Sequence, residues 1–469
     1  MNFISKMVVE MIVNTHPERI KDILRRQRAL FRSHATLAIE YRMKALRALR
    51  RAIVEREKQL CDALYADLHK SYEEAYLTEI SILLGEIDNF LKHLAGWAAP
   101  SVKRTPLKLW PSHSEILTEP LGTALIIAPW NYPVQLLLNP LIGAIAAGCT
   151  AVLKPSPYTP NVARELEELV EATFDDDYIA VVQGNREVNT LLLEQRYDVI
   201  FFTGSPALGR VVMRAAAEHL TPVILELGGK SPVVIDRTAN IALAARRVAW
   251  GKTLNAGQTC IAPDYVLIHR EVKEQFVEAF AREVERLHGK DAQQSRHYVR
   301  MVSDAAFNRV RGYIADGRLR FGGRVDARDR YIEPTLLDEI RSDSALLQDE
   351  IFGPVLPIVE IESVEEAINY INEREKPLAL YAFAESGVAR RIFELTSSGG
   401  GCINDTIMHI ANEHLPFGGV GNSGMGRYHG RDSLYAFSHR RAVLRASTRL
   451  DLPFRYMPYK LFGWVRKLL

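Results

Sequence analysis

The sequence predicts an α/β protein of two or three domains, with parallel β-sheets in the larger ones. Short apolar runs alternate with helical stretches over residues 123–229, and the alternation resumes after Cys260. Continuous apolar strands are buried on both faces, and strand–helix alternation implies a parallel sheet with crossover helices. The length of 469 residues also exceeds what one ordinary core holds.

We expect helices first, between Glu18 and about Trp97, where Arg, Lys, Glu and Leu recur at helical spacing. Beyond a connector from Pro100 to Pro111, the pattern predicts a parallel sheet of the nucleotide-binding type, with helices between its strands. These strands are expected at residues 123–129, 150–155, 179–184, 199–204 and 222–229.

A second α/β domain is expected after Cys260. Its strands are predicted at residues 265–270, 354–361, 377–384 and 401–406, and its helices at 363–375 and 388–398. The chain is rich in glycine after Gly418, and residues 435–447 then have the pattern of an extended strand that leaves its domain.

Charge and cysteine content exclude several classes of protein. With 59 basic and 57 acidic residues the net charge is +2, which does not favour binding to nucleic acid. The four cysteines form no CxxC pair, and the 13 histidines form no HExxH motif. We therefore expect neither a metal site nor a disulfide framework, and we expect a reducing, cytoplasmic location.

The two ends of the chain are expected to be peripheral. Lys6 and Glu10 interrupt the apolar start "MNFISKMVVEMIVN", which reads as a packing segment or an over-long start and not as a signal peptide. The end "YKLFGWVRKLL" is too short and too charged to span a bilayer. It suits a tail docked on its own protein, or a basic amphipathic helix in peripheral contact with a membrane.

Cys260 is the first candidate for chemistry. It lies in "LNAGQTCIAPDY", residues 254–265, where Gly257, Gln258 and Thr259 allow backbone N–H groups to approach the sulfur. A reactive cysteine needs such a donor, a cation or a base nearby. The alternative is a cysteine buried for packing, which is the expected state of the other three cysteines.

Glu226 is the second candidate. It ends the apolar strand "PVILE" and precedes Gly228 and Gly229. A carboxylate in that position is poorly solvated, so its pKa rises toward the range of a general base. A helix cap or an ion pair with Lys230 is the alternative.

Further polar residues follow the predicted strands, at the sheet edge where sites of α/β proteins gather. Asn131 lies on a turn in "APWNYP", where its carboxamide could stabilise an oxyanion or serve as an ordinary turn residue. Lys154 ends the next strand. Gly204, Ser205 and Gly209 lie where a strand leads into a helix, an arrangement that can hold a pyrophosphate, although the GxGxxG spacing is absent.

Taken together, the motifs resemble those of the aldehyde dehydrogenase superfamily. "APWNYP", "FTGS", "LELGGKSP", "NAGQTCIAPDY", "EIFGPV" and "PFGGVGNSGMGRYHG" occur in the family's order over about 300 residues. The wording "GQTCIAPDY", the short N-terminus and "RYMPY" resemble the class 3 branch, which oxidises medium-chain aliphatic and aromatic aldehydes. The resemblance covers nearly the whole chain.

The resemblance implies a mechanism. Cys260 would attack the aldehyde carbon, and the Asn131 carboxamide with the Cys260 backbone N–H would stabilise the oxyanion. Hydride would pass to a nicotinamide, and Glu226 would activate the water that hydrolyses the resulting thioester. Tyr132 and Tyr76 match positions that line the aldehyde tunnel, or they are packing residues.

The implied cofactor is NAD or NADP. Residues assigned to its site are Trp130, Lys154, Gly204, Ser205, Glu350 and Phe352. Lys154 would bind the adenosine ribose and Glu350 the nicotinamide ribose. Many NAD-preferring relatives carry Glu three residues after this lysine, whereas here the position is Pro157. We therefore predict that NADP is accepted beside NAD.

The family fold combines a Rossmann-type cofactor domain, an α/β catalytic domain and a small oligomerisation β element, usually in a dimer. On this chain the implied segments are 1–101 and 121–230 for the cofactor domain, 231–418 for the catalytic domain, 102–120 and 432–447 for the oligomerisation element, and 448–469 for the tail.

Three alternatives stay open at this point. A CoA-acylating aldehyde dehydrogenase shares the cysteine but typically lacks the residue matching Glu226. A cofactor-free cysteine hydrolase would need a histidine base, and none stands out near these motifs. A non-catalytic protein on the same scaffold would have no reason to keep Cys260, Glu226, Asn131 and Lys154 together.

Overall fold

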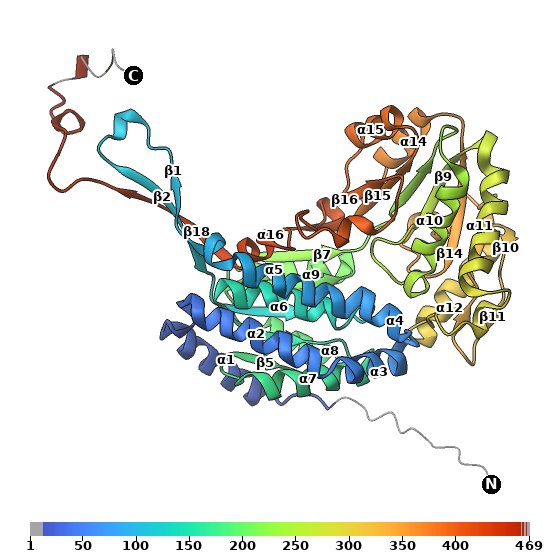
Figure 1. Cartoon of the computed structure of the whole chain (residues 1–469), viewed down its shortest axis with the longest axis horizontal. Coiled ribbons are helices and arrows are strands. Elements are labelled where there is room, and N and C mark those ends of the chain that lie inside the picture. The colour runs from blue at the N-terminus through green and yellow to red at the C-terminus, as the bar shows by residue number, and fades with distance from the viewer. Residues whose placement is uncertain (1–12, 461, 464–465, 467–469) are drawn as a thin grey trace, which may run out of the picture.

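The computed structural model describes residues 13–460, 462–463 and 466. The expectations for residues 1–12, and those for tail positions 461, 464–465 and 467–469, lie outside the described residues. Two α/β bodies stand side by side, and a narrow β arm projects from the first (Figure 1). No helix in the described ranges is long and apolar enough to cross a membrane.

The N-terminal region is helical, as predicted between Glu18 and Trp97. Its elements are α1 (Pro17–Arg32), η1 (Ala35–Leu37), α2 (Ile39–Glu55), α3 (Glu57–Leu68), α4 (Tyr72–Ala75), η2 (Tyr76–Ile80) and α5 (Ser81–Ala98). Ser71 caps α4 by accepting a hydrogen bond from the N–H of Glu74. The η2 segment is a π-helix. This form is rare in proteins as a whole, and where it occurs it often lies at a functional site.

The first sheet confirms all five predicted strands of the first alternating region. Its order is β17-β7-β6-β3-β4-β5, parallel except for β17. The strands are β3 (Thr123–Ile127), β4 (Thr150–Lys154), β5 (Ile179–Val181), β6 (Val199–Gly204), β7 (Val223–Leu227) and β17 (Gly424–Met425). The helices between them are α6 (Gln135–Ala147), α7 (Pro160–Thr173), α8 (Arg186–Leu193) and α9 (Pro206–Ala217). Strand order reverses at β3, which places a crevice beyond the carboxyl ends of β3 and β6.

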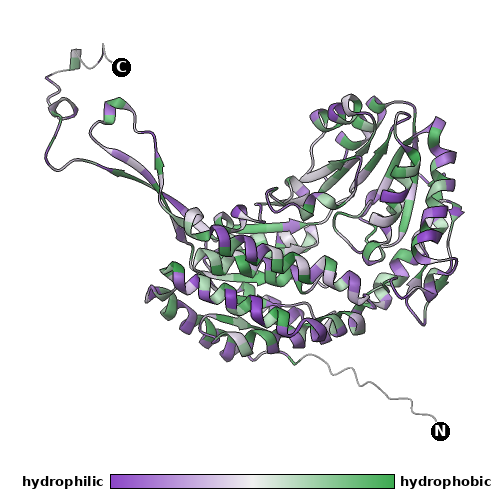
Figure 2. Cartoon of the chain, in the orientation of Figure 1, coloured by the Kyte–Doolittle hydropathy of each residue, from purple (hydrophilic) through white to green (hydrophobic). Residues whose placement is uncertain are grey.

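The second sheet confirms the second α/β region. Its order is β10-β13-β14-β9-β8-β15-β16, parallel except for the β10–β13 pair. Its strands are β8 (Pro232–Ile235), β9 (Tyr265–His269), β10 (Arg318–Phe321), β13 (Thr335–Asp338), β14 (Val355–Ile361), β15 (Ala379–Phe383) and β16 (Gly400–Ile403). Its helices are α10 (Ile241–Thr253), α11 (Lys273–His288), α12 (Asp304–Gly312), α13 (Ala345–Gln348), α14 (Val364–Asn372) and α15 (Ser386–Leu395), with a small β11 (Val325–Asp326)–β12 (Tyr331–Ile332) ribbon. The central strands β8 and β15 are buried and apolar, whereas the edge strand β10 carries two arginines and the covering helices mix hydrophilic and hydrophobic residues (Figure 2).

The arm is a three-stranded antiparallel sheet in the order β1-β2-β18. Its strands are β1 (Ser101–Lys103), β2 (His113–Pro120) and β18 (Ser438–Arg445). The expected strand at 435–447 is wrong at its start, because α16 (Arg431–Ala436) includes the first two residues of that range. This helix packs on α6 where Gly143 leaves room for Ser433, since a Cβ on Gly143 would lie 2.9 Å from the Ser433 Cβ.

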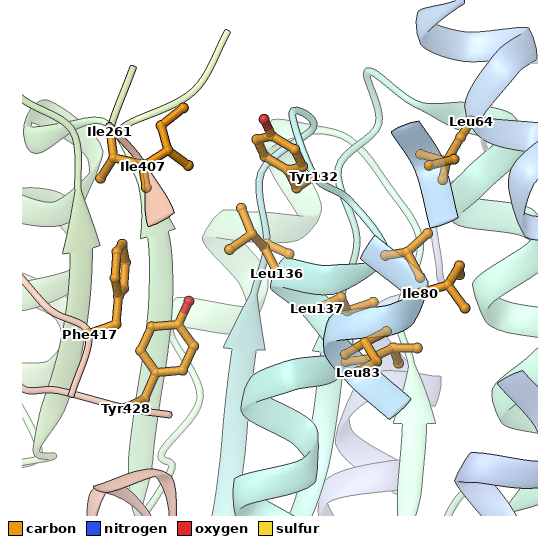
Figure 3. Packing of buried hydrophobic residues seen from close by; sticks show 14 of the residues in the cluster. Leu64, Ile80, Leu83, Tyr132, Leu136, Leu137, Ile261, Ile407, Phe417 and Tyr428 are labelled. Carbon is orange, nitrogen blue, oxygen red and sulfur yellow. The ribbon is translucent and has the colours of Figure 1, made fainter. Parts of the chain in front are cut away.

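Helix α6 is the centre of the first body, buried along its whole length from Gln135 to Ala147. Leu137 packs toward Ile80 and Leu83 of the N-terminal helices, while Leu136 faces the other way, toward Phe417 (Figure 3). Burial of one such leucine stabilises the fold by about 1.5–3 kcal/mol. The helix therefore fixes the turn before it, which carries Asn131, against a rigid core.

Candidate active site

Two cavities meet at Cys260. One has a volume of about 270 Å³ and opens toward β6 and β7. The other has a volume of about 490 Å³ and lies between α5, α6 and the 407–413 loop. The residues that line both are Leu136, Cys260, Phe417 and Tyr428. A group bound in one cavity therefore reaches a group bound in the other at the Cys260 sulfur.

A strained turn presents Cys260. Asn255 and Ala256 both have φ 51°, and Gly257 has φ 71°, so three residues in a row are in the left-handed region that L side chains avoid. A Cβ at Gly257 would lie 2.3 Å from the Gly353 carbonyl oxygen, which explains the glycine. The Gln258 side chain holds the turn, donating to the carbonyl oxygens of Asn255 and Arg300, each at 3.1 Å.

Asn131 lies beside this turn, as expected from its place after β3. Its side-chain Nδ2 donates to the Gln258 backbone carbonyl oxygen at 3.0 Å. The Asn131 backbone carbonyl oxygen accepts from Asn255 Nδ2 at 2.9 Å. An amide nitrogen carries two N–H groups, so the second has no partner among the described residues. The carboxamide is thus held at the 270 Å³ cavity that Cys260 also lines.

A buried ion pair that the sequence did not reveal supports the Asn131 turn. Lys70 and Glu79 are both fully buried, and the Lys70 Nζ lies 2.7 Å from the Glu79 Oε1. Lys70 Nζ also donates to the Asn131 carbonyl oxygen at 3.3 Å. Glu79 Oε2 accepts from the N–H groups of Val134 and Gln135, at 2.8 and 3.2 Å, where α6 begins. The one sign of this ion pair in the sequence is the charged Glu79 within the apolar stretch "YLTEISILL".

Glu79→Gln is expected to lower the free energy of unfolding by about 3–5 kcal/mol, because it leaves the Lys70 ammonium buried without a counter-charge. Denaturant titration of the purified variant measures this loss. Glu73→Gln is the matched control, since Glu73 pairs with Arg296 at the surface and should change stability hardly at all. Equal stability of the two variants would show that the buried pair does not support the turn.

Glu226, on β7, is buried and faces the first cavity. Neither carboxylate oxygen has a hydrogen-bond partner within the described part of the chain, and burial raises its pKa well above the usual value. The alternative ion pair with Lys230 is wrong. Lys230 Nζ donates to Asp264 Oδ1 at 2.5 Å and to the carbonyl oxygens of Leu346 and Asp349 instead.

The Cys260 thiol is also held in its neutral form. Burial, followed by the nearby carboxylates of Glu350 and Glu226, raises the pKa of the thiol. The thiolate is the nucleophilic form, so attack by this sulfur requires a base. Glu226 lines the same cavity with a raised pKa and is able to accept a proton there.

The first cavity has the features of a cofactor site. Trp130 and Phe352 meet edge to face with ring centroids 5.4 Å apart, and both line it. Glu350 lines it with one buried carboxylate oxygen that has no partner in the described structure. Burial, and then the charge of Asp264, raise the pKa of Glu350 to about 8. A Cβ at Gly228 would lie 2.1 Å from Glu350 Oε2, so only glycine leaves this space open.

Gly204 and Ser205 line the same cavity where β6 leads into α9. Ser205 caps the helix by accepting from the N–H of Leu208 at 3.4 Å. The positive end of the helix suits a diphosphate. These features fit the dinucleotide that the sequence predicts.

Lys154 does not line either cavity. It ends β4 in register with Ile127 of β3, and its buried Nζ donates to the Pro155 carbonyl oxygen at 2.7 Å. Burial lowers its pKa to about 8. It lies at the predicted sheet edge, one strand away from the turn that carries Asn131.

The two tyrosines predicted for the substrate site differ in position. Tyr132 lines the larger cavity, and its hydroxyl lies 2.7 Å from Thr259 Oγ1. Tyr76 does not line it. Its ring instead stacks on the ring of Tyr72, with the two ring centroids 6.4 Å apart. The next residues, Leu77 and Thr78, line the cavity. No group of metal-binding side chains occurs among the residues that the structure describes.

Comparison with known proteins agrees with the motifs. The model of the aldehyde dehydrogenase family matches residues 2–443. The 4,4'-diaponeurosporen-aldehyde dehydrogenase of Staphylococcus aureus is 48% identical over 436 residues, which cover 92% of this chain and 95% of that protein. The dimeric NADP-preferring aldehyde dehydrogenase of Canis lupus familiaris is 45% identical over 444 residues, covering 94% and 98%.

Among solved structures, the substrate-bound state of Staphylococcus aureus AldH matches with a TM-score of 0.94 at 46% identity. The match covers 96% of this chain and 99% of that chain. Human aldehyde dehydrogenase family 3 member B1 is 46% identical over 440 residues, which cover 93% of this chain and 94% of that protein.

Proposed function

The chain belongs to the aldehyde dehydrogenase family and is an NAD(P)-dependent aldehyde dehydrogenase, and we propose that it oxidises apolar aldehydes to carboxylic acids. These would be medium- or long-chain aliphatic or aromatic aldehydes. The observation that carries the proposal is the meeting of two cavities at Cys260, the larger of which is walled mainly by apolar side chains.

In this mechanism Cys260 attacks the carbonyl carbon of an aldehyde that lies in the larger cavity. A base must accept the thiol proton. Glu226 would be this base, because its carboxylate lines the adjoining cavity and has no hydrogen-bond partner in the described structure. Negative charge then develops on the aldehyde oxygen. The second N–H of the Asn131 carboxamide and the Cys260 backbone N–H would stabilise it.

A bound oxidised nicotinamide supplies the hydride acceptor that converts the tetrahedral adduct to a thioester. Trp130, Gly204, Ser205, Glu350 and Phe352 would hold the cofactor in the first cavity. Glu226 would then take a proton from the water that attacks the thioester, releasing the acid and restoring the Cys260 sulfur.

Lys154 and Pro157 would set the choice between NAD and NADP. The side chain of Pro157 neither accepts hydrogen bonds from ribose hydroxyls nor repels a 2′-phosphate. Pro157→Glu is expected to lower kcat/KM for NADP at least about tenfold relative to NAD, because it adds a like charge beside the phosphate. Steady-state kinetics with both cofactors measures this ratio. Equal loss with both would contradict the role.

We also propose the domain division 1–101 and 121–230, 231–418, and 102–120 with 432–447, which the two large sheets and the sheet of the arm support. The arm exposes Val102, Leu107 and Trp110 by 80%, 87% and 57%. Exposed apolar groups of this kind mark interaction surfaces, so we infer a homodimer formed through the arm. Peripheral membrane contact by the 448–469 tail and a cytoplasmic location stay proposals from the sequence.

Formation of reduced cofactor by the purified protein tests the function. A short aliphatic, a long aliphatic and an aromatic aldehyde are each assayed with NAD and with NADP, using Cys260→Ala as the blank. We expect turnover that favours the longer and aromatic aldehydes and disappears in the blank. Turnover only after addition of CoA would contradict hydrolysis of the thioester and indicate the CoA-acylating reaction.

A further inference from the structure

The larger cavity contains a polar side chain that the mechanism above does not use. Asn139 on α6 lines this cavity and is 1% exposed. Neither its Oδ1 nor its Nδ2 has a hydrogen-bond partner in the described structure. An unpaired buried amide costs free energy unless a ligand or water satisfies it, so its presence among apolar walls points to a bound polar group.

The position of Asn139 along α6 separates it from the reacting centre. Asn131 precedes the helix, Leu136 lies in its first turn and lines both cavities, and Asn139 lines the larger one alone. The rise of an α-helix places Asn139 about 4.5 Å further along the axis than Leu136. An aldehyde held at Cys260 and Asn131 would therefore meet Asn139 with a more remote part of its chain.

Further buried polar groups line the same cavity, among them Gln135 on α6 and two from other segments. His429 is 5% exposed, and its Nε2 has no partner among the described residues. Burial, and then the charge of His409, lower the pKa of His429 to about 4, so the ring is neutral at physiological pH. Glu86 on α5 is 6% exposed and accepts from the N–H of Gly430 at 2.7 Å.

The cavity offers neutral donors and acceptors beside two acidic side chains, Glu86 and Glu413, and no cation lines it in the described chain. A carboxylate at the far end of a substrate would lack a counter-charge and would share the cavity with Glu86 and Glu413. A hydroxyl, carbonyl or carboxamide would instead satisfy the Asn139 amide, which both donates and accepts. The chemistry therefore selects a neutral polar group.

We propose that the larger cavity takes aldehydes whose apolar chain ends in a neutral hydrogen-bonding group, and that Asn139 binds this group. The inference rests on the proposed function, because it assumes that the aldehyde enters this cavity toward Cys260. It narrows the substrate class from any apolar aldehyde to chains with a second polar function at a fixed distance from the aldehyde.

Matched pairs of n-alkanals and ω-hydroxyalkanals, from about six to twelve carbons, test the proposal. The preference is the kcat/KM of the hydroxylated aldehyde divided by that of the alkanal of equal length. In the wild-type enzyme we expect this preference to peak at one chain length, because the hydroxyl reaches Asn139 only there. Asn139→Leu should lower the peak about fivefold to tenfold.

Asn189→Leu is the matched control, since Asn189 lies on α8 and lines neither cavity. Asn139→Ala repeats the test if the leucine variant does not fold. Calorimetric binding of the same pairs to Cys260→Ala gives the preference without turnover, so that a failure of the proposed reaction and a failure of this inference are distinguished. A preference that does not vary with chain length, or that survives both Asn139 variants, would overturn the inference.

Discussion

Cys260→Ala is expected to abolish aldehyde oxidation, with kcat lowered at least about 10⁴-fold, because the covalent route requires the sulfur. The cysteine lies where the two cavities meet, and none of the other three lines either of them. Cofactor reduction with a long-chain aldehyde measures the loss. Cofactor binding by the variant, followed by fluorescence, shows that the first cavity stays intact.

Cys402→Ala is the matched control for this experiment. Cys402 is half-buried on β16, with its sulfur 3.5 Å from His409 Nδ1, and burial raises the pKa of its thiol to about 11. It should keep the wild-type rate. Retention of activity by Cys260→Ala, or its loss in Cys402→Ala, would place the nucleophile elsewhere.

Glu226→Gln is expected to lower the steady-state kcat by roughly 10²–10⁴-fold, the usual contribution of a general base. The first turnover should be slowed less than hydrolysis, because the thiol that loses its proton in the first step is a much stronger acid than the water that must lose one in the second. A burst of reduced cofactor close to one per active site, followed by slow turnover, is then expected in stopped-flow measurements. Absence of a burst would assign the carboxylate to an earlier step.

The pH dependence of the same variant provides a further readout. Burial raises the pKa of Glu226, so the carboxylate that acts as base forms as pH increases through that raised value. The wild-type kcat should therefore rise with pH, and Glu226→Gln should lose this rise. An unchanged pH profile in the variant would show that another group supplies the proton acceptor.

Sequence patterns were sufficient to predict five strands of the first sheet and four of the second, and to single out Asn131 and Glu226, which line a cavity with Cys260. Buried parallel strands are mainly apolar, so runs such as "TALII" are visible without any structure. Asn131 lies on the turn after one such strand, and Glu226 lies near the end of another. The boundary at Tyr435 was wrong because Gly143 on α6 allows α16 to pack against it. That contact is between segments almost 300 residues apart.

The second cavity shows what the sequence could not reveal. Tyr76 and Leu77 are neighbours, yet the π-helix turns Leu77 toward the cavity and leaves Tyr76 on Tyr72. Similarly, the pairing of Lys70 with Glu79 depends on how α3 and the π-helix meet. Side-chain direction in an irregular helix follows from tertiary packing, which local propensity does not specify.

Intact and peptide mass spectrometry of Glu226→Gln, after reaction with octanal and NAD or NADP, tests most directly whether Cys260 carries the acyl group. Slow hydrolysis should allow the thioester to accumulate. We expect a mass increase of one octanoyl group on the peptide that contains Cys260. No acyl adduct despite formation of reduced cofactor, or an adduct on Cys61, Cys149 or Cys402, would contradict this expectation.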